Sequence, residues 1–406
     1  MPEAGTRVAV IFGGPSVEHD VSIISALQLL AVLSERHRPT AVYLSRDGRF
    51  YTGEALLDVK AFGESPPVGG EPLELVLGGE GTPFQRPRTS RLRGPRELPV
   101  DVVVCAIHGT GGEDGSLLGA LEHAGLPYVG GGVGPAAVAM DKALAKLAFA
   151  GAGITVNPHA IVTREGFATD PQAVVEACLA DPGVPCFAKP VSLGSSIGVS
   201  RCADADQLHE ALELCLELDR RALVEPALDD AIEINCAVLG RPGEPARVSL
   251  LEQPLGAGGS LSFEDKYMRG GKDGKGGGAK EAPGPGAKLA EGGGGGMAAQ
   301  DRLIPAPLED GLAARIRAIA VDAHAALGFA GVVRYDFLVD ERTGEVVLNE
   351  ANTVPGSFSF YLFEPAGLSF PDLADQLIDI AIAEAAEQRA TTRTFESALL
   401  SRHGAT

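Results

Sequence analysis

The sequence predicts an α/β protein whose N-terminal part holds an open sheet of parallel strands, with further domains behind it. Residues 7–12 form an apolar run typical of a buried parallel strand, a Gly-Gly-Pro turn ends the run, and residues 17–33 have a helical pattern. A second apolar run at 101–107 also leads into a glycine-rich loop. Open α/β sheets bind ligands at the carboxyl ends of their strands, so both loops are expected to border a ligand site. The length of 406 residues exceeds that of a usual single domain.

The middle of the chain predicts a small separate domain. A helix rich in lysine and alanine at 141–152 precedes a strand at 186–189, and a short strand at 223–225 is closed by Pro226. Chain direction and turn chemistry change at both ends of this stretch. We therefore expect three domains, at 1–143, 144–226 and 227–406.

The last part of the chain predicts a low-complexity insertion, a helix and a hairpin. Residues 269–300 are rich in Gly, Ala, Lys and Pro, so burial offsets too little of the entropy lost on ordering, and a disordered insertion is expected. Such a tract can still form the tip of a mobile lid. Apolar residues then recur at helical spacing over 312–327, strands at 331–339 and 345–349 form a hairpin, and a closing helix covers 373–381.

Composition excludes several classes of function. The formal charge of −20 argues against a nucleic-acid partner, and the arginine-rich stretch at 86–96 is interpreted as a solvated loop. The six cysteines form no CxxC pair, so reduced core residues are expected instead of a zinc site or disulfides. No apolar run reaches the roughly 18 residues of a membrane span. The first residues lead into a strand and not a signal sequence, and a cytoplasmic protein is expected.

The predicted hairpin carries the strongest local signal for chemistry. Arg334 and Asp336 lie two positions apart, as do Glu350 and Asn352, and residues two apart on a strand point to the same face. Oxygen ligands without His or Cys suit a hard cation such as Mg²⁺ that is held partly by nucleotide phosphates. The alternative is an ordinary exposed face with salt bridges.

Two lysines precede elements that could bind phosphate. Lys142 opens one predicted helix, and Lys189 ends a strand directly before the glycine and serine loop at 190–198. Backbone N–H groups of such a loop can approach phosphate oxygens while a lysine supplies a point charge. Taken alone, the loop fits a plain turn better.

Four further polar residues have both a functional and an ordinary interpretation. Glu225 and Glu233 flank a short acidic connection and could bind an adenine amino group and ribose hydroxyls, or be surface carboxylates. Glu18 lies near a helix start, where an acid also interacts favourably with the helix dipole. His108 could be a core or turn histidine.

Eight segments, taken in chain order, resemble one family. They are FGGPSVEHDVS, AIHGTGGEDGSLLGALE, PYVGGGVGPAAVAMDKALAK, FAKPVSLGSSIGVS, LVEPALDDAIEINCAVLG, EDKY, RYDF and LNEANTVPG. The set resembles the D-alanine:D-alanine ligase family of the ATP-grasp superfamily and spans about residues 7 to 380. The MDK, GSS and NEAN-T-PG elements are the most specific.

The resemblance implies a three-domain ATP-grasp fold. It places a doubly wound parallel-sheet domain at the N-terminus, followed by two α+β domains that hold ATP between them. It also implies ATP as a substrate and two Mg²⁺ (or Mn²⁺) ions. The residues that it assigns to ATP are Lys142, Lys189, Ser196, Glu225, Glu233 and Lys266. The metal ligands that it implies are Asp336, Glu350 and Asn352.

The resemblance also implies roles around the amino acid substrates. Glu18 matches the carboxylate that holds the ammonium of the first amino acid, with Ser195 and Tyr267 beside it. His108 matches a histidine near the acyl phosphate. Arg334 and the backbone N–H of Gly356 match the groups that face the developing oxyanion, and Arg334 also lies near the second substrate's carboxylate.

Two departures from the family concern the second substrate and the lid. In the family, a serine five positions beyond the glycine matched by Gly356 holds the carboxylate of the second amino acid, whereas Tyr361 and then Leu362 stand here. A tyrosine hydroxyl can also donate to a carboxylate, but its ring changes the size of the pocket. After Lys266 and Tyr267 the lid lacks the family's polar and aromatic pattern and runs into the glycine tract.

These features predict a ligase that joins two D-alanines through an acyl phosphate, with conversion of ATP to ADP and phosphate, for peptidoglycan precursor synthesis. The alternative is a related ATP-grasp ligase that joins other amino acids into a dipeptide or specialised metabolite. A catalytically silent nucleotide-binding protein is disfavoured, because no metal or phosphate residue is lost. The expected partners are small amino acids, with neither nucleic acid nor membrane, and the resemblance implies a homodimer.

Overall fold

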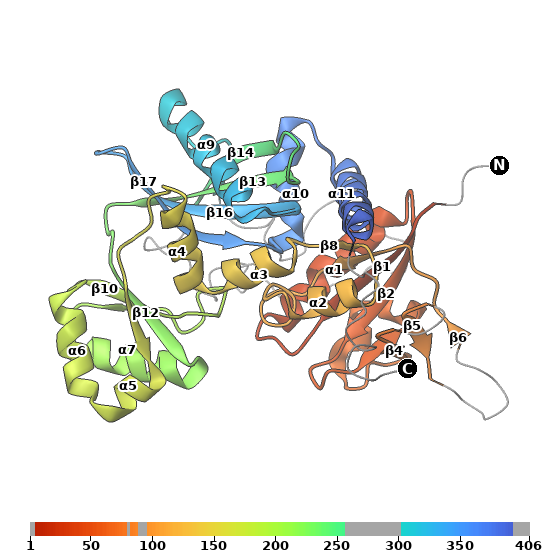
Figure 1. The fold of residues 1–406 in the computed structure, drawn as a ribbon, viewed down its shortest axis with the longest axis horizontal. Coiled ribbons are helices and arrows are strands. Elements are labelled where there is room, and N and C mark those ends of the chain that lie inside the picture. Colours follow the sequence, from red (N-terminus) through yellow and green to blue (C-terminus); the bar gives the residue numbers. More distant parts are fainter. Residues whose placement is uncertain (1–4, 79–81, 88–95, 256–301, 393–406) are drawn as a thin grey trace, which may run out of the picture.

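Three sheets with their helices make up the protein (Figure 1). The computed structural model describes residues 5–78, 82–87, 96–255 and 302–392. The chain builds an eight-stranded sheet first, then a four-stranded sheet, and then a five-stranded sheet. The predicted α/β class is confirmed.

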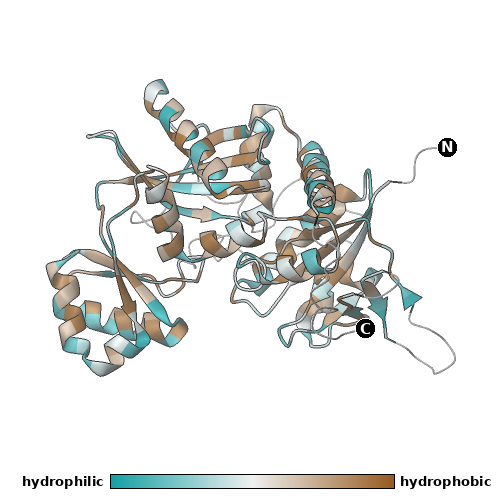
Figure 2. Ribbon diagram, viewed as in Figure 1, coloured by the Kyte–Doolittle hydropathy of each residue, from teal (hydrophilic) through white to brown (hydrophobic). Residues whose placement is uncertain are grey.

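The eight-stranded sheet is parallel at its centre and antiparallel at one side. Its strands are β1 (Arg7–Gly13), β2 (Arg38–Leu44), β3 (Phe50–Thr52), β4 (Glu71–Leu75), β5 (Phe84–Arg86), β6 (Arg96–Glu97), β7 (Val102–Cys105) and β8 (Tyr128–Val129). Strands β2, β1, β7 and β8 run parallel, and β3 to β6 extend the sheet in antiparallel fashion. Parallel strands need both faces covered, whereas antiparallel strands tolerate a solvated face. Accordingly, β5 and β6 are mainly hydrophilic in Figure 2.

One helix of this first part was predicted, and three further helices accompany it. Helix α1 (His19–Leu33) follows β1 and matches the helix predicted at 17–33, two short 3₁₀ helices η1 (Glu54–Leu57) and η2 (Val59–Gly63) follow β3, and α2 (Ser116–His123) follows β7. The turn after β1 requires glycine, because Gly13 has a φ of 90° and a Cβ there would lie 2.4 Å from the Leu44 carbonyl oxygen.

The last helix of the described chain returns to the first sheet. Helix α11 (Phe370–Ala390) is capped at its N-terminus by Ser369, whose side chain accepts a hydrogen bond from the Asp372 N–H. Its buried Leu373 and Leu377 belong to the same apolar cluster as Val8 of β1. In Figure 1, α11 lies beside α1, and the two helices are in contact. The predicted closing helix therefore completes the core of the N-terminal sheet.

The four-stranded sheet is antiparallel and forms the small unit at the lower left of Figure 1. Its strands are β9 (Ala160–Thr163), β10 (Cys186–Pro190), β11 (Ser200–Cys202) and β12 (Arg221–Pro226), in the order β11-β10-β12-β9. Helices α5 (Arg164–Thr169), α6 (Pro171–Ala180) and α7 (Ala205–Leu218) pack on it around a core of their own. Asp170 and Asp204 cap α6 and α7 by accepting hydrogen bonds from backbone N–H groups of the first turns.

The five-stranded sheet has one apolar face and one polar face. Its strands are β13 (Ile232–Gly240), β14 (Arg247–Pro254), β15 (Arg302–Leu303), β16 (Gly331–Asp340) and β17 (Glu345–Asn352), in the order β15-β14-β13-β16-β17. Helices α4 (Lys142–Gly151) and α9 (Asp310–Leu327) cover the apolar face, where Tyr335 and Phe337 are fully buried. Because side chains alternate along a strand, Arg334 and Asp336 face the opposite way.

Short helices connect the larger elements. Helix α3 (Val133–Met140) precedes α4, and η5 (Gly356–Ser359), α10 (Phe360–Phe363) and η6 (Glu364–Ala366) lie between β17 and α11. The predicted hairpin is confirmed, with β17 reaching three residues beyond the predicted end. All six cysteines are buried and free, as predicted. In the described parts of the chain, no helix is long and apolar enough to cross a membrane.

Two predictions concern residues outside this description. The insertion predicted at 269–300 lies outside the described residues. Of the arginine-rich stretch, Arg86 lies in β5 with its Nε 2.7 Å from a Glu71 oxygen, and Arg96 lies in β6. Residues 88–95 lie outside the described part.

Candidate active site

A cleft lies between the four-stranded sheet and the polar face of the five-stranded sheet. It has an empty volume of about 1160 Å³. Residues from α4, β10, β12, β13 and β17 all contribute to its walls. The walls include Lys142, Lys189, Ser196, Glu225, Glu233 and Glu350. Residues predicted from the sequence to bind nucleotide or metal thus line a single cleft.

A buried carboxylate holds two lysines at one wall of this cleft. Glu225 is 1% exposed and lies 2.9 Å from the Lys146 Nζ, and the Lys189 Nζ donates to its other oxygen. Burial alone would raise the pKa of Glu225, but Lys189 and Lys146 lower it to about 2. Burial also lowers the pKa of Lys146, which Glu225 opposes. Glu225 is therefore an ionised core residue, and the alternative of a surface carboxylate is excluded.

The glycine and serine loop adopts a strained conformation beside Lys142. Ser195 and Ser196 have φ values of 52° and 59°, in the left-handed region that residues other than glycine adopt only rarely. Backbone strain of this kind is concentrated at functional sites. The Lys142 Nζ donates to the Leu193 carbonyl at 2.5 Å and lies 3.7 Å from a Glu350 oxygen. The lysine thus lies between this loop and the predicted metal site.

A β-bulge in β17 directs two consecutive polar residues into the cleft. Asp336 pairs with Glu350 and Phe337 pairs with Leu348, so Asn349 has no partner on β16. Asn349 and Glu350 both line the cleft. The Lys189 Nζ donates to the Asn349 side chain at 3.4 Å. Strict alternation along a strand predicts only one of the two residues, which explains why Asn349 was missed.

The predicted metal ligands form a connected group on β16 and β17. Asp336 accepts hydrogen bonds from the Arg334 Nε at 2.7 Å, from the Arg334 Nη2 at 2.8 Å, and from the Asn352 Nδ2 at 2.9 Å. Burial opposes the charge on Arg334, but Asp336 raises the pKa of this arginine well above its ordinary value. The alternative of an exposed salt-bridged face is excluded, because Arg334 and Asp336 are both buried.

The oxygen donors of this group fit magnesium. Asp336 and Glu350 are cross-strand partners, and Arg334 and Asn352 form the neighbouring pair. Two carboxylates and one amide oxygen match the preference of a hard cation that is completed by phosphate oxygens. The described residues contain no cluster of three or more His, Cys, Asp or Glu side chains that could hold a metal ion alone. The three oxygen donors of Asp336, Glu350 and Asn352 would therefore need further ligands to complete the shell of such a cation.

A second group of polar residues lies where α1 meets the glycine and serine loop. Glu18 precedes α1, is 5% exposed, and accepts a hydrogen bond from the Ser195 hydroxyl. Two glycines let backbone approach this carboxylate, since an added Cβ would lie 2.6 Å from the Glu18 Oε2 at Gly109 and 3.0 Å at Gly194. The structure therefore brings Glu18 and Ser195 together, as predicted. Lys266 and Tyr267 lie outside the described residues.

A buried carboxylate joins the N-terminal sheet to the loop after β17. Glu113 accepts hydrogen bonds from the Gly109 N–H at 2.7 Å and from the Val354 N–H at 2.9 Å. His108 bonds to the backbone of the same Val354, and its Nε2 lies 3.0 Å from the Ser25 hydroxyl. Burial lowers the pKa of His108 to about 4, so the ring is neutral at pH 7. These bonds fix the segment that leads to Gly356, two residues after Val354.

The segment after Gly356 is buried and strained. Ser357, Phe358 and Ser359 have φ values of 49°, 55° and 54°. Leu362 is fully buried in the core that contains α1 and α11, so its side chain packs within the protein and is not exposed to a pocket. Tyr361 is 9% exposed, and its hydroxyl donates to a Glu252 oxygen at 3.3 Å.

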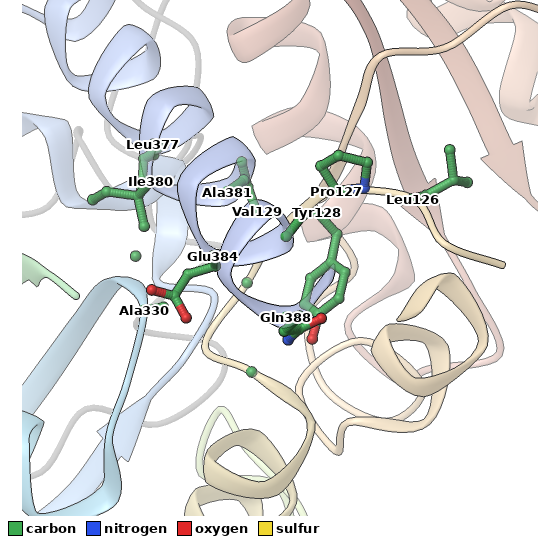
Figure 3. Close-up of a pocket in the computed structure, with 14 residues that line it drawn as sticks. Leu126, Pro127, Tyr128, Val129, Ala330, Leu377, Ile380, Ala381, Glu384 and Gln388 are labelled. Atoms are coloured by element: carbon green, nitrogen blue, oxygen red, sulfur yellow. The ribbon is translucent and has the colours of Figure 1, made fainter. Parts of the chain in front are cut away.

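A second cavity lies at the junction of α11 with β8 and the start of β16. It has an empty volume of about 420 Å³. Figure 3 shows Leu377, Ile380 and Glu384 projecting from α11 along one wall. Glu384 is engaged within the protein, because the Arg241 Nε donates to it at 2.7 Å. The cavity contains none of the residues predicted to act in catalysis.

Sequence analysis missed three residues of the site. Lys146 lies four positions after Lys142, hence on the same side of α4, and this spacing was the available signal. Glu113 lies within the glycine-rich loop that was expected to border a ligand. Asn349 directly precedes Glu350, but only the bulge gives it access to the cleft.

Known proteins are similar to this chain in sequence. The family model described as the D-ala D-ala ligase N-terminus matches residues 7–131, and that described as the D-ala D-ala ligase C-terminus matches 148–276 and 297–379. A D-alanine–D-alanine ligase of Chlorobium limicola is 35% identical over 389 residues, which cover 93% of this chain and 97% of that protein. One of Bradyrhizobium sp. is 34% identical and covers 94% of this chain and 97% of its own length.

Solved structures agree with the sequence comparisons. The D-alanine–D-alanine ligase of Coxiella burnetii aligns with a TM-score of 0.74 at 27% identity, over 95% of this chain and 96% of that one. The VanG D-Ala:D-Ser ligase of Enterococcus faecalis aligns with a TM-score of 0.71 at 28% identity, over 93% and 99% of the two chains. The similarity covers nearly the full length of each protein. The chain therefore belongs to the D-alanine–D-alanine ligase family.

Proposed function

We propose that this protein joins two D-alanine molecules into D-alanyl-D-alanine, with conversion of ATP to ADP and phosphate, to supply a peptidoglycan precursor. The observation that carries this proposal is the continuity of one site. Lys142, Lys189 and Glu350 line the cleft together with Ser196, and the neighbouring Ser195 donates to Glu18 of the N-terminal part. Relatives of about 35% identity over almost the whole chain carry the name D-alanine–D-alanine ligase.

The nucleotide is proposed to occupy the cleft beside Lys142 and Lys189. Transfer of a phosphoryl group to a carboxylate brings like charges together, and lysines reduce that repulsion. Glu225 holds the Lys189 ammonium in place, and Asn349 contacts it from β17. Ser196 and Glu233 also line the cleft and are proposed as nucleotide contacts. Lys266 remains the predicted contact to the terminal phosphate.

Magnesium is proposed to be held by Asp336, Glu350 and Asn352. Divalent ions at this position neutralise phosphate charge and orient the transferred group. Arg334 already contacts both oxygens of Asp336, so this guanidinium lies directly beside the metal donors. A cationic donor next to the reacting centre can stabilise an oxyanion.

The chemistry that these residues support has two stages. The carboxylate of the first D-alanine, whose ammonium is held by Glu18, attacks the terminal phosphorus of ATP. The bond from this phosphorus to the bridging oxygen breaks, and ADP leaves with that oxygen. The neutral amine of the second D-alanine then attacks the acyl carbon, its nitrogen loses one proton, and phosphate leaves as the amide forms. Arg334 and the Gly356 N–H are proposed to stabilise the oxyanion, a contribution of roughly 3 kcal/mol for one such donor. His108 is proposed to lie near the acyl phosphate as a neutral ring.

The domain boundaries, the location, the oligomeric state and the acceptor amino acid are also proposals. The proposed domain boundaries near residues 143 and 226 rest on the change of sheet between β8 and β9 and between β12 and β13, although α4, which spans the first boundary, packs on the five-stranded sheet. A cytoplasmic location, a homodimer and Tyr267 beside Glu18 rest on family membership. A different acceptor amino acid is the second candidate, because Tyr361 stands where the family has serine and because VanG is named as a D-Ala:D-Ser ligase.

Phosphate release with ATP and magnesium tests the proposal. The protein should be assayed with single D- and L-amino acids and with their pairs, and the products should be identified by mass. Release with D-alanine alone, accompanied by the mass of D-alanyl-D-alanine, is the expected result. Release only with another pair would retain the ligase chemistry and overturn the acceptor assignment.

A further inference from the structure

A row of polar side chains crosses the polar face of the five-stranded sheet. Backbone register pairs Glu252 with Asn235, Asn235 with Asp336, and Asp336 with Glu350. Direct cross-strand partners lie on the same face of a sheet, so these four side chains follow one another from β14 to β17. Glu252 therefore lies on the same face as the proposed metal donors, two strands away from Asp336.

Glu252 is the centre of a buried cluster at its end of the row. It is 1% exposed, accepts from the Asn235 Nδ2 at 3.2 Å and from the Tyr361 hydroxyl at 3.3 Å, and lies 2.7 Å from the Arg302 Nη1. The Arg302 guanidinium also lies over the Tyr361 ring, 4.2 Å from its centroid. The side chain of Arg302 is 10% exposed. An ion pair and a cation–π contact thus fix the position of this arginine.

The contacts of Tyr361 determine which of its groups can meet a substrate. Burial and Glu252 raise the pKa of Tyr361 to about 12, so the hydroxyl keeps its proton and donates it to Glu252. A hydroxyl that is committed to Glu252 is not the replacement for the serine that family members have at this position. Tyr361 presents its ring to Arg302, and its hydroxyl also accepts a hydrogen bond from this arginine.

Two arginines with different carboxylate partners lie near Tyr361. Arg334 and Arg302 both lower the pKa of Tyr361, so both lie close to it. Arg334 uses its Nε and Nη2 for Asp336, on the side of the metal donors. Arg302 lies at the Glu252 end of the row. A guanidinium carries five N–H donors in a fork, so a contact with Glu252 is compatible with a second carboxylate.

We propose that Arg302, placed by Glu252 and the Tyr361 ring, binds the carboxylate of the acceptor amino acid. This inference rests on the proposed function and specifies its acceptor: an amino acid with a free carboxylate, recognised by a guanidinium in place of a serine hydroxyl. Glu252 is a positioning residue in this arrangement, and Tyr361 is the surface on which the arginine is stacked. Arg302 belongs to β15, directly after the part of the chain that contains Lys266 and Tyr267.

A competition between two acceptors isolates the contact with the carboxylate. Wild-type protein is supplied with ATP, magnesium and equal concentrations of D-alanine and D-alaninamide, and the two products are quantified by mass. D-Alaninamide retains the amine but has no carboxylate, so the wild type should form predominantly D-alanyl-D-alanine. Arg302→Gln should lower the ratio of acid to amide product by about 10- to 100-fold, the effect of one charge-assisted contact.

Matched variants separate this role from a merely structural one. Arg302→Lys keeps the charge and the stem but loses the fork, so a smaller fall in the ratio is expected, and this variant serves if Arg302→Gln fails to fold. Tyr361→Phe keeps the ring beneath Arg302 but removes the hydroxyl that contacts Glu252 and Arg302, so a smaller fall in the ratio than in Arg302→Gln is expected. Arg315→Gln is the control, since that arginine is on α9 and bonds to the Gly344 carbonyl.

Each outcome decides between the inference and its alternatives. An unchanged ratio in both Arg302 variants, or a fall in Tyr361→Phe equal to that in Arg302→Gln, would overturn the role of Arg302. If wild-type protein makes no D-alanyl-D-alanine, the proposed acceptor is wrong, and the same comparison is made with the acceptor that the amino acid panel identifies and with its amide. The two failures are therefore distinguishable.

Discussion

Replacing Glu225 with glutamine tests the buried cluster that shapes the nucleotide cleft. The side chain keeps its size but loses its charge, while the 2%-exposed Lys146 remains where it is. Lys189 loses the same partner. The variant therefore leaves a buried ammonium without its carboxylate, which proteins tolerate poorly.

The size of the effect follows from the pKa of Glu225. A fall from the ordinary value of 4.5 to about 2 means that the folded protein favours the ionised carboxylate by about 3 kcal/mol. Breaking a buried pair by removal of one partner costs about 3 to 5 kcal/mol in general. At roughly 2 to 4 °C per kcal/mol, a loss of 3 kcal/mol lowers the melting temperature by about 6 to 12 °C.

Calorimetric melting over a range of pH is the assay. In Glu225→Gln, Lys146 loses the carboxylate that raises its pKa, so the pKa of this lysine in the folded state falls further below the ordinary value of 10.5. The unfolded chain then binds more protons than the folded chain up to about pH 10.5, and the stability of the variant should rise with pH more steeply than that of the wild type.

Two further variants make the comparison specific. Glu213→Gln, in which the changed carboxylate on α7 is 64% exposed, should melt within about 1 °C of the wild type. The double variant Lys146→Met with Glu225→Gln should recover part of the loss, because the unpaired buried ammonium is gone. A melting temperature of Glu225→Gln equal to that of the wild type, with parallel pH dependence, would refute the reasoning.

Three other perturbations test the metal site, the interdomain bond and the buried histidines. Glu350→Gln should abolish phosphate release and leave the melting temperature almost unchanged, since it weakens a metal ligand and not the core; wild-type turnover would exclude Glu350 as a ligand. In Glu113→Gln, an amide NH2 group replaces one of the two oxygens that accept backbone N–H groups, so one of these N–H groups loses its acceptor and kcat should fall about 10-fold or more. Asp114→Asn in the same loop should have a much smaller effect. Equal effects of these two substitutions on kcat would argue against the positioning role of Glu113. Burial lowers the pKa of His108 and of His324 to about 4. The unfolded chain therefore takes up protons below pH 6.5 and the folded chain only near pH 4, so the folded state loses stability as the pH falls. Urea titration should show a free energy of unfolding that is lower at pH 5 than at pH 7 by about 2 kcal/mol for each of the two histidines. Stability that is constant over this range would show that these rings are already protonated or become exposed.

Several parts of the fold could be predicted because local rules determine them. A strand ended by Gly13, the helix of α9, and the polar pair Arg334 and Asp336 on one strand face all follow from residues a few positions apart. The motifs around Lys142 and Lys189 predicted a nucleotide site, and the structure places both lysines at the wall of one cleft.

Other parts depended on which elements pack together. Glu113 bonds to Val354 across 241 positions, and Glu225 to Lys189 across 36. The bulge at Asn349 arises from the register between β16 and β17, which local alternation does not specify. The same holds for the return of α11 to the first sheet.

By itself, then, the sequence determined the α/β class, several of the strands and helices that carry the site, the family and most of the predicted polar residues that line the cleft. Only the tertiary structure decided that Glu225 is a buried partner of two lysines, that the Tyr361 hydroxyl is taken by Glu252, and that Arg302 lies on the Tyr361 ring. The physical reason is that burial and ion pairing depend on neighbours brought together by folding, whereas residue type and spacing describe only neighbours along the chain.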